Sequence, residues 1–433
     1  MLSPFIRNSG TLLTGNVVAQ GLAFLAYIVL LRLFTPDDFG LCNVFFSYTE
    51  VLIILSTCKY EMAIVVAPDD TEASLLARLA FRLNTFISLL LLVAATVMAL
   101  SDLTLSHLPA ALLFFIPLLV YFTGTYRIYV FLCNRHKEYR PLALGEIVSV
   151  TSSTGTRILF GLLTPLFGFL HTLGLPLGSV LGKMAGHAYL RHIVRRKHNY
   201  YQPSAAPLRP IARKYINYAR YLMPRELVSS FSANLPLMWL SLYFGKPLLG
   251  LFSLALTFTQ RPAGILANTF EKVLYQTSAV AVQHRQPLRR NIMRFVLLLG
   301  GGLVLVGALL FLFAEPLFVF LFGSQWVGTG FYVRCLLPWM AILVLSNSLS
   351  FISNLFNTQR IDFIIQVVQL ILRAAALYCG IRLHNFRLAV LLFCAVSAVV
   401  QAAQLGWYLI QVGRYERHPQ SFNPSSTSQP PTA

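Results

Sequence analysis

Charged residues inside apolar segments are the feature that most constrains how this chain can fold. About twelve segments are long and apolar enough to cross a membrane as helices. Two acidic residues, Glu50 and Glu226, oppose six basic residues at similar depth, and the six are Arg127, Arg157, Lys183, Arg225, Arg261 and Arg373. A charge at the bilayer centre costs about 2.5–3.5 kcal/mol, so six cations facing lipid would cost on the order of 15–20 kcal/mol. Since that exceeds the net stability of a typical fold, we expect them to face a polar cavity that takes an anionic ligand.

The composition indicates an integral membrane protein of the all-α class. Of 433 residues, 56% are hydrophobic and 11% are charged, whereas a soluble domain has about 25% charged residues. The net charge of +19 could indicate a nucleic-acid partner. Many of the basic residues, however, lie in short loops between spans, where the preference for positive cytoplasmic loops explains them. We therefore predict that the chain binds no nucleic acid.

The sequence lacks the motifs of metal sites, cofactor sites and common enzymes. Its six cysteines include no CxxC pair, its nine histidines form no HExxH pattern, and GxSxG, P-loop and GxGxxG motifs are absent. We predict no metal, no cofactor and no catalytic activity. The first apolar run, 11–33, is too long for a cleavable signal and is expected to remain as a helix. The lack of a transit-like Arg/Ser segment favours a bacterial plasma (inner) membrane.

Loop charges predict the orientation of the spans. We expect spans near 10–33, 40–66, 74–100, 108–132, 142–164, 170–192, 216–243, 248–280, 292–314, 331–356, 361–382 and 386–412. Three basic loops then fall on one side (134–140, 191–214 and 284–290), and the opposite loops at 101–107, 164–170 and 314–331 contain no Lys or Arg. Both termini are therefore expected in the cytoplasm. Arg32, Arg382 and Arg387 are exceptions to this pattern.

A polar, proline-containing linker divides the chain into two halves that resemble each other. We predict a six-helix lobe at 1–193, a cytoplasmic basic linker at 194–214, a second six-helix lobe at 215–413 and a disordered cytoplasmic tail at 414–433. At an offset of 210, Gly40 aligns with Gly250, and Glu50 aligns with Gln260. Two hairpins could share this turn chemistry by chance. If the repeat is real, the even number of spans per lobe predicts a pseudo-two-fold axis along the membrane normal.

Several charged residues have more than one interpretation. Four cations could line a cavity or form internal ion pairs, namely Arg157, Lys183, Arg261 and Arg373. Arg127 lies near the inner interface and could be a topological signal, and Glu50 could pair with an arginine or relay ions. Lys59 and Glu61 could form an interfacial pair, and Arg225 and Glu226 could mark only a kink after Pro224. No role is predicted for Glu146 or Asp362. The aromatic-rich segment 314–330 is expected to be an outer interfacial helix or a re-entrant turn.

Three short motifs resemble those of the Wzx-type polysaccharide-unit (O-antigen) flippases, a branch of the multidrug/oligosaccharidyl-lipid/polysaccharide exporter superfamily. The first is 31–40, LRLFTPDDFG, which resembles the exit of the first helix. The second is 59–66, KYEMAIVV, followed by an acidic turn. The third is 321–326, LFGSQW. Family members often have acidic residues where Ser324 and Gln325 stand, so no role of those acids is carried over. The resemblance extends over about residues 8–412.

The resemblance implies a twelve-helix, two-lobed transporter with a central cationic cavity. Its implied cargo is an undecaprenyl-diphosphate-linked oligosaccharide, moved from the inner to the outer leaflet by alternating access during synthesis of surface polysaccharide such as lipopolysaccharide. A diphosphate must cross about 30 Å of hydrocarbon, and arginine can bind phosphate oxygens in bidentate fashion. Implied partners are the lipid-linked substrate, membrane lipids, a polysaccharide polymerase and a chain-length regulator.

We therefore predict a flippase that binds its substrate through the six cations, with Glu50 and Glu226 balancing charge or coupling ions. Neutralising two of the cations should abolish translocation while the protein still inserts. A drug exporter of the same superfamily is the first alternative, although cationic drugs would favour an acidic cavity. A membrane glycan polymerase or ligase would need a reactive outer loop, and in a non-transporting scaffold the buried charges would merely pair.

Overall fold

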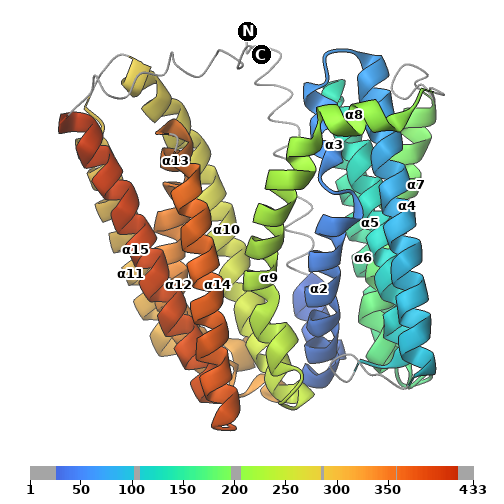
Figure 1. Ribbon diagram of the computed structural model, residues 1–433. Coiled ribbons are helices and arrows are strands. Elements are labelled where there is room, and N and C mark those ends of the chain that lie inside the picture. The colour runs from blue at the N-terminus through green and yellow to red at the C-terminus, as the bar shows by residue number, and fades with distance from the viewer. Residues whose placement is uncertain (1–25, 102–107, 197–205, 284–286, 357, 418–433) are drawn as a thin grey trace. The chain divides into compact units, whose positions relative to one another are not determined.

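The structure is a computed structural model that describes residues 26–101, 108–196, 206–283, 287–356 and 358–417. Most of the first predicted span, part of the linker and most of the predicted tail lie outside these residues. The described chain is helical and contains no strand. This confirms the predicted all-α class (Figure 1).

Eleven helices of 18 residues or more account for every predicted span after the first. They are α2 (Pro36–Ser56), α4 (Asp70–Leu100), α5 (Ala110–Arg135), α6 (Tyr139–Leu163), α7 (Leu170–Arg196), α9 (Met223–Leu240), α10 (Lys246–Gln283), α11 (Arg289–Phe322), α12 (Thr329–Ser348), α14 (Gln359–Arg382) and α15 (Phe386–Arg417). In the described part of the chain, seven segments are long and apolar enough to cross a membrane. The chain is therefore a multi-pass membrane protein.

Short elements connect the long helices or extend them. They are α3 (Tyr60–Val66), α8 (Leu208–Lys214), the π-helical turn η1 (Tyr218–Leu222), the 3₁₀ turn η2 (Ser324–Trp326) and α13 (Phe351–Leu355). The predicted span 40–66 is thus two helices, α2 and α3. Between them Cys58 and Lys59 have φ values of 49° and 63°, a left-handed conformation that is uncommon outside glycine. Such strain often marks functional positions.

Capping residues fix where the helices begin. At α2, the Thr35 hydroxyl accepts from the backbone N–H of Asp38, and the Asp38 carboxylate accepts from the backbone N–H of Thr35 at 2.9 Å. This reciprocal capping box satisfies two otherwise orphaned donors, and Pro36 supplies the preferred first residue. At α4, Asp69 caps the N–H of Glu72 at 2.6 Å. The start of α2 thus follows from the sequence 35–38 alone.

The predicted interfacial helix or re-entrant turn at 314–330 is wrong. Residues 289–322 form one continuous helix, α11, which passes through Pro316. The Glu315 carboxylate accepts hydrogen bonds from the N–H groups of Gly328 and Gly330, the latter at 2.9 Å, at the start of α12. The ionisable residue of this segment therefore caps the next helix.

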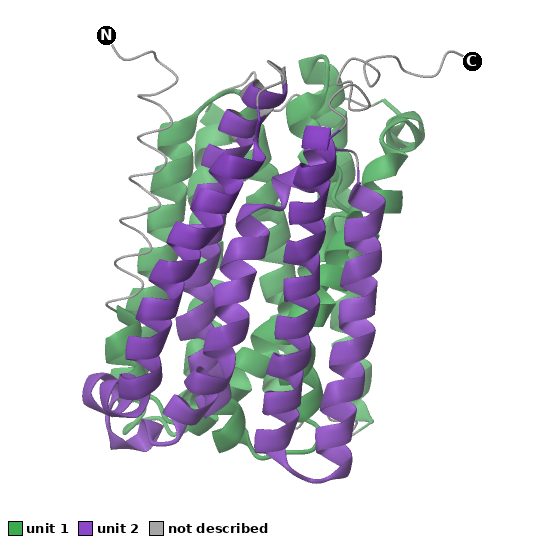
Figure 2. Cartoon of the chain, turned by 90° about the vertical axis from the view of Figure 1, so that its left-hand side faces the viewer, with its two compact units in different colours: residues 1–250 green, residues 251–433 purple. Residues whose placement is uncertain are grey.

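The chain divides into two compact units, residues 1–250 and 251–433 (Figure 2). Unit 1 contains α2 to α9 together with the first residues of α10, and unit 2 contains the rest of α10 and α11 to α15. The lobes predicted at 1–193 and 215–413 remain a prediction. Within unit 1, α9 packs along α2, so contacts assign α9 to the N-terminal unit. The last helix is also longer than expected, since α15 continues to Arg417 and so includes the first residues of the predicted tail.

Glycines at every fourth residue bring α7 close to α6. Gly178, Gly182 and Gly186 lie on the face of α7 that meets α6. A Cβ on Gly182 would lie 2.7 Å from the carbonyl oxygen of Ser149, and one on Gly186 would lie 2.8 Å from the Ser149 Cβ. Small residues at this spacing let membrane helices approach closely. The close approach positions the polar side chains of α6 and α7 described below.

The basic linker docks on unit 1 through charged contacts at α8. Lys214 forms an ion pair with Glu72 of α4, and the Tyr215 hydroxyl donates to the same carboxylate at 2.9 Å. Burial, the hydrogen bond to Glu72 and its negative charge raise the pKa of Tyr215 to about 12, so this phenol stays a donor at neutral pH. On the same end of α4, Asp70 accepts from the Arg135 guanidinium at 2.9 Å. The contacts of Lys214 and Tyr215 with Glu72 hold α8 across the end of α4 (Figure 1).

Candidate functional site

Lys183 lies in a polar cluster between α5, α6 and α7 of unit 1. Its ammonium group lies 4.7 Å from the centre of the Tyr126 ring, and the Tyr126 hydroxyl donates to the Glu146 carboxylate at 2.9 Å. Glu146 and Arg127 both interact electrostatically with Lys183. Lys183 is about 20 Å from the end of α7 at Arg196, at 1.5 Å per residue. The membrane depth predicted for Lys183 and Arg127 remains a prediction, and the sequence gave no role to Glu146, which the structure places in this cluster.

Arg157 joins α6 to α7 and α2. Its Nε donates to the backbone carbonyl of Leu175 at 3.1 Å, and its terminal nitrogen donates to the Ser179 hydroxyl. The guanidinium lies 5.5 Å from the centre of the Phe46 ring. Arg157 is half-buried. These contacts are with a carbonyl, a hydroxyl and an aromatic ring, and they tie α6 to α7 and α2 within unit 1.

The polar residues of α2 and α9 meet along the contact between these helices. Asn234 of α9 donates to the Glu50 carboxylate at 3.1 Å, whereas the sequence favoured an arginine partner for Glu50. Lys59, at the break between α2 and α3, forms an ion pair with Glu226. This contact replaces the expected pair of Lys59 with Glu61. Arg225, the neighbour of Glu226, has an exposed side chain.

The Lys59–Glu226 pair is asymmetric, because the Lys59 side chain is 8% exposed and that of Glu226 is 39% exposed. We expect Glu226→Gln to destabilise the protein by about 1–3 kcal/mol, since it leaves a buried ammonium group without its counter-charge. Lys59→Met should cost less, because the remaining carboxylate can reach water. The double variant should cost less than the sum of the two single variants.

Thermal unfolding of the four purified proteins would measure this cycle. Equal and additive losses from the two single substitutions would show that the pair carries no coupling and would contradict the expectation.

Unit 2 holds the two remaining cations in different environments. Arg373 on α14 is 5% exposed and donates to the Ser397 hydroxyl at 2.8 Å. Its guanidinium lies 4.9 Å from the Trp339 ring centre and 5.1 Å from that of Phe393. Arg261 on α10 has an exposed side chain. In this conformation Arg261 is therefore accessible and Arg373 is enclosed.

A buried polar ladder between α14 and α15 escaped the sequence analysis. Asp362 is 4% exposed and accepts from the Tyr408 hydroxyl at 2.9 Å and from the Gln404 amide at 3.4 Å. The ladder continues through Gln401 to Gln369. The sequence assigned no role to Asp362, and its hydrogen bonds show that it anchors this network. The spacing of Gln401, Gln404 and Tyr408 on one face of α15 was the available signal.

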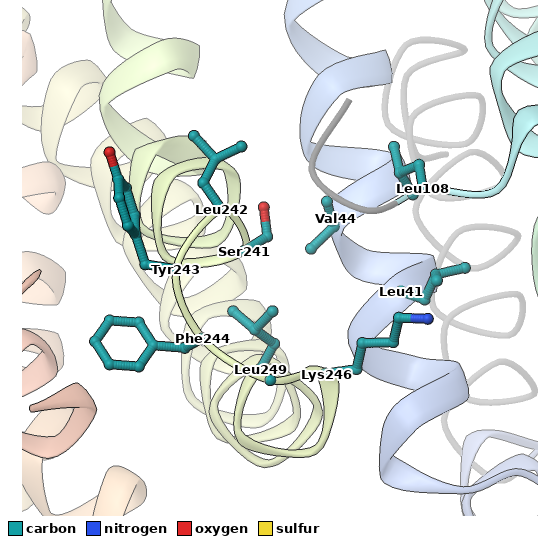
Figure 3. A pocket seen from close by; sticks show the side chains of 10 residues that line it. Leu41, Val44, Leu108, Ser241, Leu242, Tyr243, Phe244, Lys246 and Leu249 are labelled. Carbon is teal, nitrogen blue, oxygen red and sulfur yellow. The ribbon is translucent and has the colours of Figure 1, made fainter. Parts of the chain in front are cut away.

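A pocket of about 420 Å³ lies at the end of unit 1 where α2 begins (Figure 3). Leu41 and Val44 of α2 form one wall, and the turn between α9 and α10 forms the other. Lys246 is the charged residue among those that line it, and its side chain points toward α2. Lys246 also lines a neighbouring pocket of about 260 Å³ with Asp37 and Asp38. The six predicted cations line neither pocket.

Comparisons with known proteins add a family and a fold. The family model described as "Polysaccharide biosynthesis protein" matches residues 29–330. The lipid II flippase MurJ in an inward closed conformation superposes with a TM-score of 0.70 at 12% identity, covering 94% of this chain and 90% of that one. An inward-facing multidrug resistance transporter of the MATE family in the MOP superfamily gives 0.67 at 13% identity, covering 92% and 96%.

A MOP superfamily transporter from Pyrococcus furiosus, whose binding pocket is described as reversed in polarity, gives a TM-score of 0.57 at 14% identity over 94% of this chain and 95% of that one. No curated protein sequence matches the chain. At these identities the structural likeness establishes the fold of the chain, and it confirms the predicted all-helical, two-lobed fold.

Proposed function

We propose a specific activity on the premise that this chain belongs to the family of polysaccharide biosynthesis proteins, whose model covers most of its length. The activity is translocation of an undecaprenyl-diphosphate-linked oligosaccharide from the inner to the outer leaflet by alternating access. The chain would act in a bacterial inner membrane with both termini in the cytoplasm, as the basic loops predict. The family and the fold shared with a lipid II flippase support this proposal.

Exposed arginines on α9 and α10, two helices that the sequence predicts to span the membrane, carry the proposal. At a rise of 1.5 Å per residue, Arg225 on α9 lies about 10 Å from Tyr218, where the preceding turn η1 begins. On the same basis, Arg261 lies about 22 Å from Lys246, the first residue of α10. Both side chains are exposed. An arginine facing lipid at such depth costs about 2.5–3.5 kcal/mol, so each is better placed against water or an anionic group. A diphosphate passing through the membrane supplies that group.

The enclosed cations and the two acids have supporting roles in this proposal. The substrate-binding set is the one predicted from the sequence: Arg127, Arg157, Lys183, Arg225, Arg261 and Arg373. Arg225 of unit 1 and Arg261 of unit 2 would each meet the diphosphate at some stage of its passage, because both side chains are exposed, whereas Arg373 would become accessible only if its aromatic enclosure opens. Glu226 balances the charge of Lys59, and the exposed Glu50 is the better candidate for ion coupling.

A multidrug exporter is the second candidate, because the chain shares its fold with a MATE transporter. Cationic drugs favour an acidic binding site, whereas the accessible charges at membrane depth here include two arginines. The charge balance therefore supports an anionic cargo.

Reconstituted transport would test the proposal. The full-length protein would be placed in liposomes that contain undecaprenyl diphosphate bearing a short, fluorescently labelled oligosaccharide. A membrane-impermeant reductant destroys the label in the outer leaflet, so flipping converts a protected half of the signal into an accessible one. We expect protein-dependent loss of the protected half. Full protection, together with transport of a cationic dye by the same liposomes, would favour the drug exporter.

A further inference from the structure

A groove in unit 1 runs over α5 between α4 and α7 and has no role in the proposed transport. Its volume is about 390 Å³. Phe81 of α4 lines one side, the floor comes from α5, and the other side comes from α7; the lining residues of α5 and α7 are Tyr121, Thr125, Tyr129, His187, Arg191, Val194 and Arg195. The groove is therefore basic at the end of α7 and aromatic farther in.

Two arginines form the mouth of this groove. Arg191 and Arg195 are four residues apart on α7, so they lie one above the other on the same face of the helix. Both side chains are exposed. They lie in the last turns of α7, which ends at Arg196, at the basic end of a predicted span, where we expect the phosphates of membrane lipids. Two guanidinium groups at this spacing are suited to a phosphodiester.

A buried histidine with an unused nitrogen lies deeper in the groove. His187 is 8% exposed, and its Nδ1 has no hydrogen-bond partner among the described residues. The ring is held in place by Phe122, at 5.5 Å between centroids, and by Tyr129, at 5.4 Å. A buried polar nitrogen without a partner is costly. The imidazole ring of His187 lines the groove, and an oxygen atom of a bound ligand would satisfy this nitrogen.

The depth of the groove distinguishes a lipid from a soluble phosphate. His187 lies about 12 Å from Arg195 along α7, and Tyr121 lies about 21 Å from the end of α5 at Arg135, at 1.5 Å per residue. Phe81 and Tyr129 pack together at 5.2 Å along the wall. A soluble phosphate would use the arginine mouth alone. A phospholipid would place its phosphate at the mouth, its ester oxygens near His187 and the start of an acyl chain on the aromatic floor.

We propose that this groove binds one anionic membrane phospholipid, with its phosphate on Arg191 and Arg195 and an ester oxygen on His187. None of the residues that line the groove belongs to the proposed substrate-binding set, and occupancy of the groove does not depend on whether the chain is a flippase. Binding of a lipid here would fasten α4, α5 and α7 to one another at the basic end of unit 1.

Native mass spectrometry of the full-length protein in detergent would count bound phosphatidylglycerol and, separately, phosphatidylcholine. We expect one phosphatidylglycerol to bind more tightly than the rest. Arg191→Gln/Arg195→Gln should weaken this first binding step by about tenfold or more, because charge-assisted contacts to phosphate are the strong ones. The control Arg289→Gln/Arg290→Gln removes the same charge from two exposed arginines at the start of α11 and should leave the step unchanged.

His187→Phe is a second variant that tests the proposed contact with the ester oxygen. Phenylalanine keeps the aromatic contacts of the ring and removes its nitrogens. We expect a smaller but clear weakening of the first step. The proposal is overturned if the two double variants bind phosphatidylglycerol alike, or if phosphatidylcholine binds as tightly. It is also overturned if inorganic phosphate or undecaprenyl diphosphate displaces the first lipid, since the groove would then serve a soluble phosphate or the transported substrate. None of these results depends on a transport assay.

Discussion

The double variant Arg225→Gln/Arg261→Gln is expected to reach the membrane in a folded state and to flip a lipid-linked oligosaccharide about 100-fold more slowly than the parent protein. Each hydrogen bond to a charged group contributes about 1.5–3 kcal/mol, and 1.4 kcal/mol corresponds to a factor of about ten. Two lost contacts to a diphosphate therefore reduce transport by two orders of magnitude or more. The protein-dependent loss of the protected label in liposomes would measure the rate.

The fold should tolerate these substitutions because both side chains are exposed. Exposed positions usually change stability by no more than about 0.5 kcal/mol on substitution, and glutamine retains a polar head group for an aqueous route. Thermal unfolding in detergent should therefore match that of the parent protein. A large loss of thermal stability would mean that the arginines have a structural role instead.

A matched control comes from the linker helix. Arg209 and Arg213 are exposed residues of α8, so Arg209→Gln/Arg213→Gln lowers the net charge by the same amount without touching a membrane span. We expect normal transport from this control. Normal transport from the Arg225→Gln/Arg261→Gln variant would remove the main support for an anionic cargo.

Apolar length predicted the helices well, whereas the capping residues that fix where α2 begins were not used. Every predicted span after the first corresponds to a helix or a pair of helices, because a membrane segment must satisfy its backbone internally. The beginning of α2 follows from its capping box. The break at Cys58 and Lys59 was missed because neither glycine nor proline marks it, and α11 was ended too early because proline is tolerated within a membrane helix.

The partners of the charged residues were much harder to predict. Helical periodicity gives the direction of a side chain around its own helix, but it does not say which helix lies opposite. Lys59 therefore finds Glu226 instead of its near neighbour Glu61, and Glu50 finds Asn234. One available signal was not used. The spacing of Gly178, Gly182 and Gly186 predicts a close helix contact, and that contact sets Arg157 against α7.

The glycines that the repeat hypothesis aligned are in direct contact. Gly40 of α2 and Gly250 of α10 pack so closely that a Cβ on Gly40 would lie 2.9 Å from the backbone nitrogen of Gly250. A Cβ on Gly250 would overlap the carbonyl group of Pro36, whose carbon would be 2.6 Å away. Equivalent positions of two repeats touch only near a symmetry axis. The repeat remains a prediction, and this contact is one that it would produce.

Gly250→Ala should therefore destabilise the protein by about 1–3 kcal/mol, the usual cost of overpacking. The clash is with backbone, which cannot rotate away as a side chain can, so the first turns of α2 and α10 must separate. Gly40→Ala should have a similar effect. The two losses should not add, because either methyl group forces the same separation.

Gly264→Ala provides the contrast on the same helix. No atom lies within 4 Å of a Cβ at this position, so alanine should leave stability unchanged or raise it by up to about 1 kcal/mol through helix propensity. Thermal unfolding of the three single variants and of Gly40→Ala/Gly250→Ala would compare them directly. Equal midpoint temperatures of thermal unfolding for Gly250→Ala and Gly264→Ala would show that α2 and α10 can separate without a loss of stability. The close contact between the two helices would then contribute nothing to the stability of the fold.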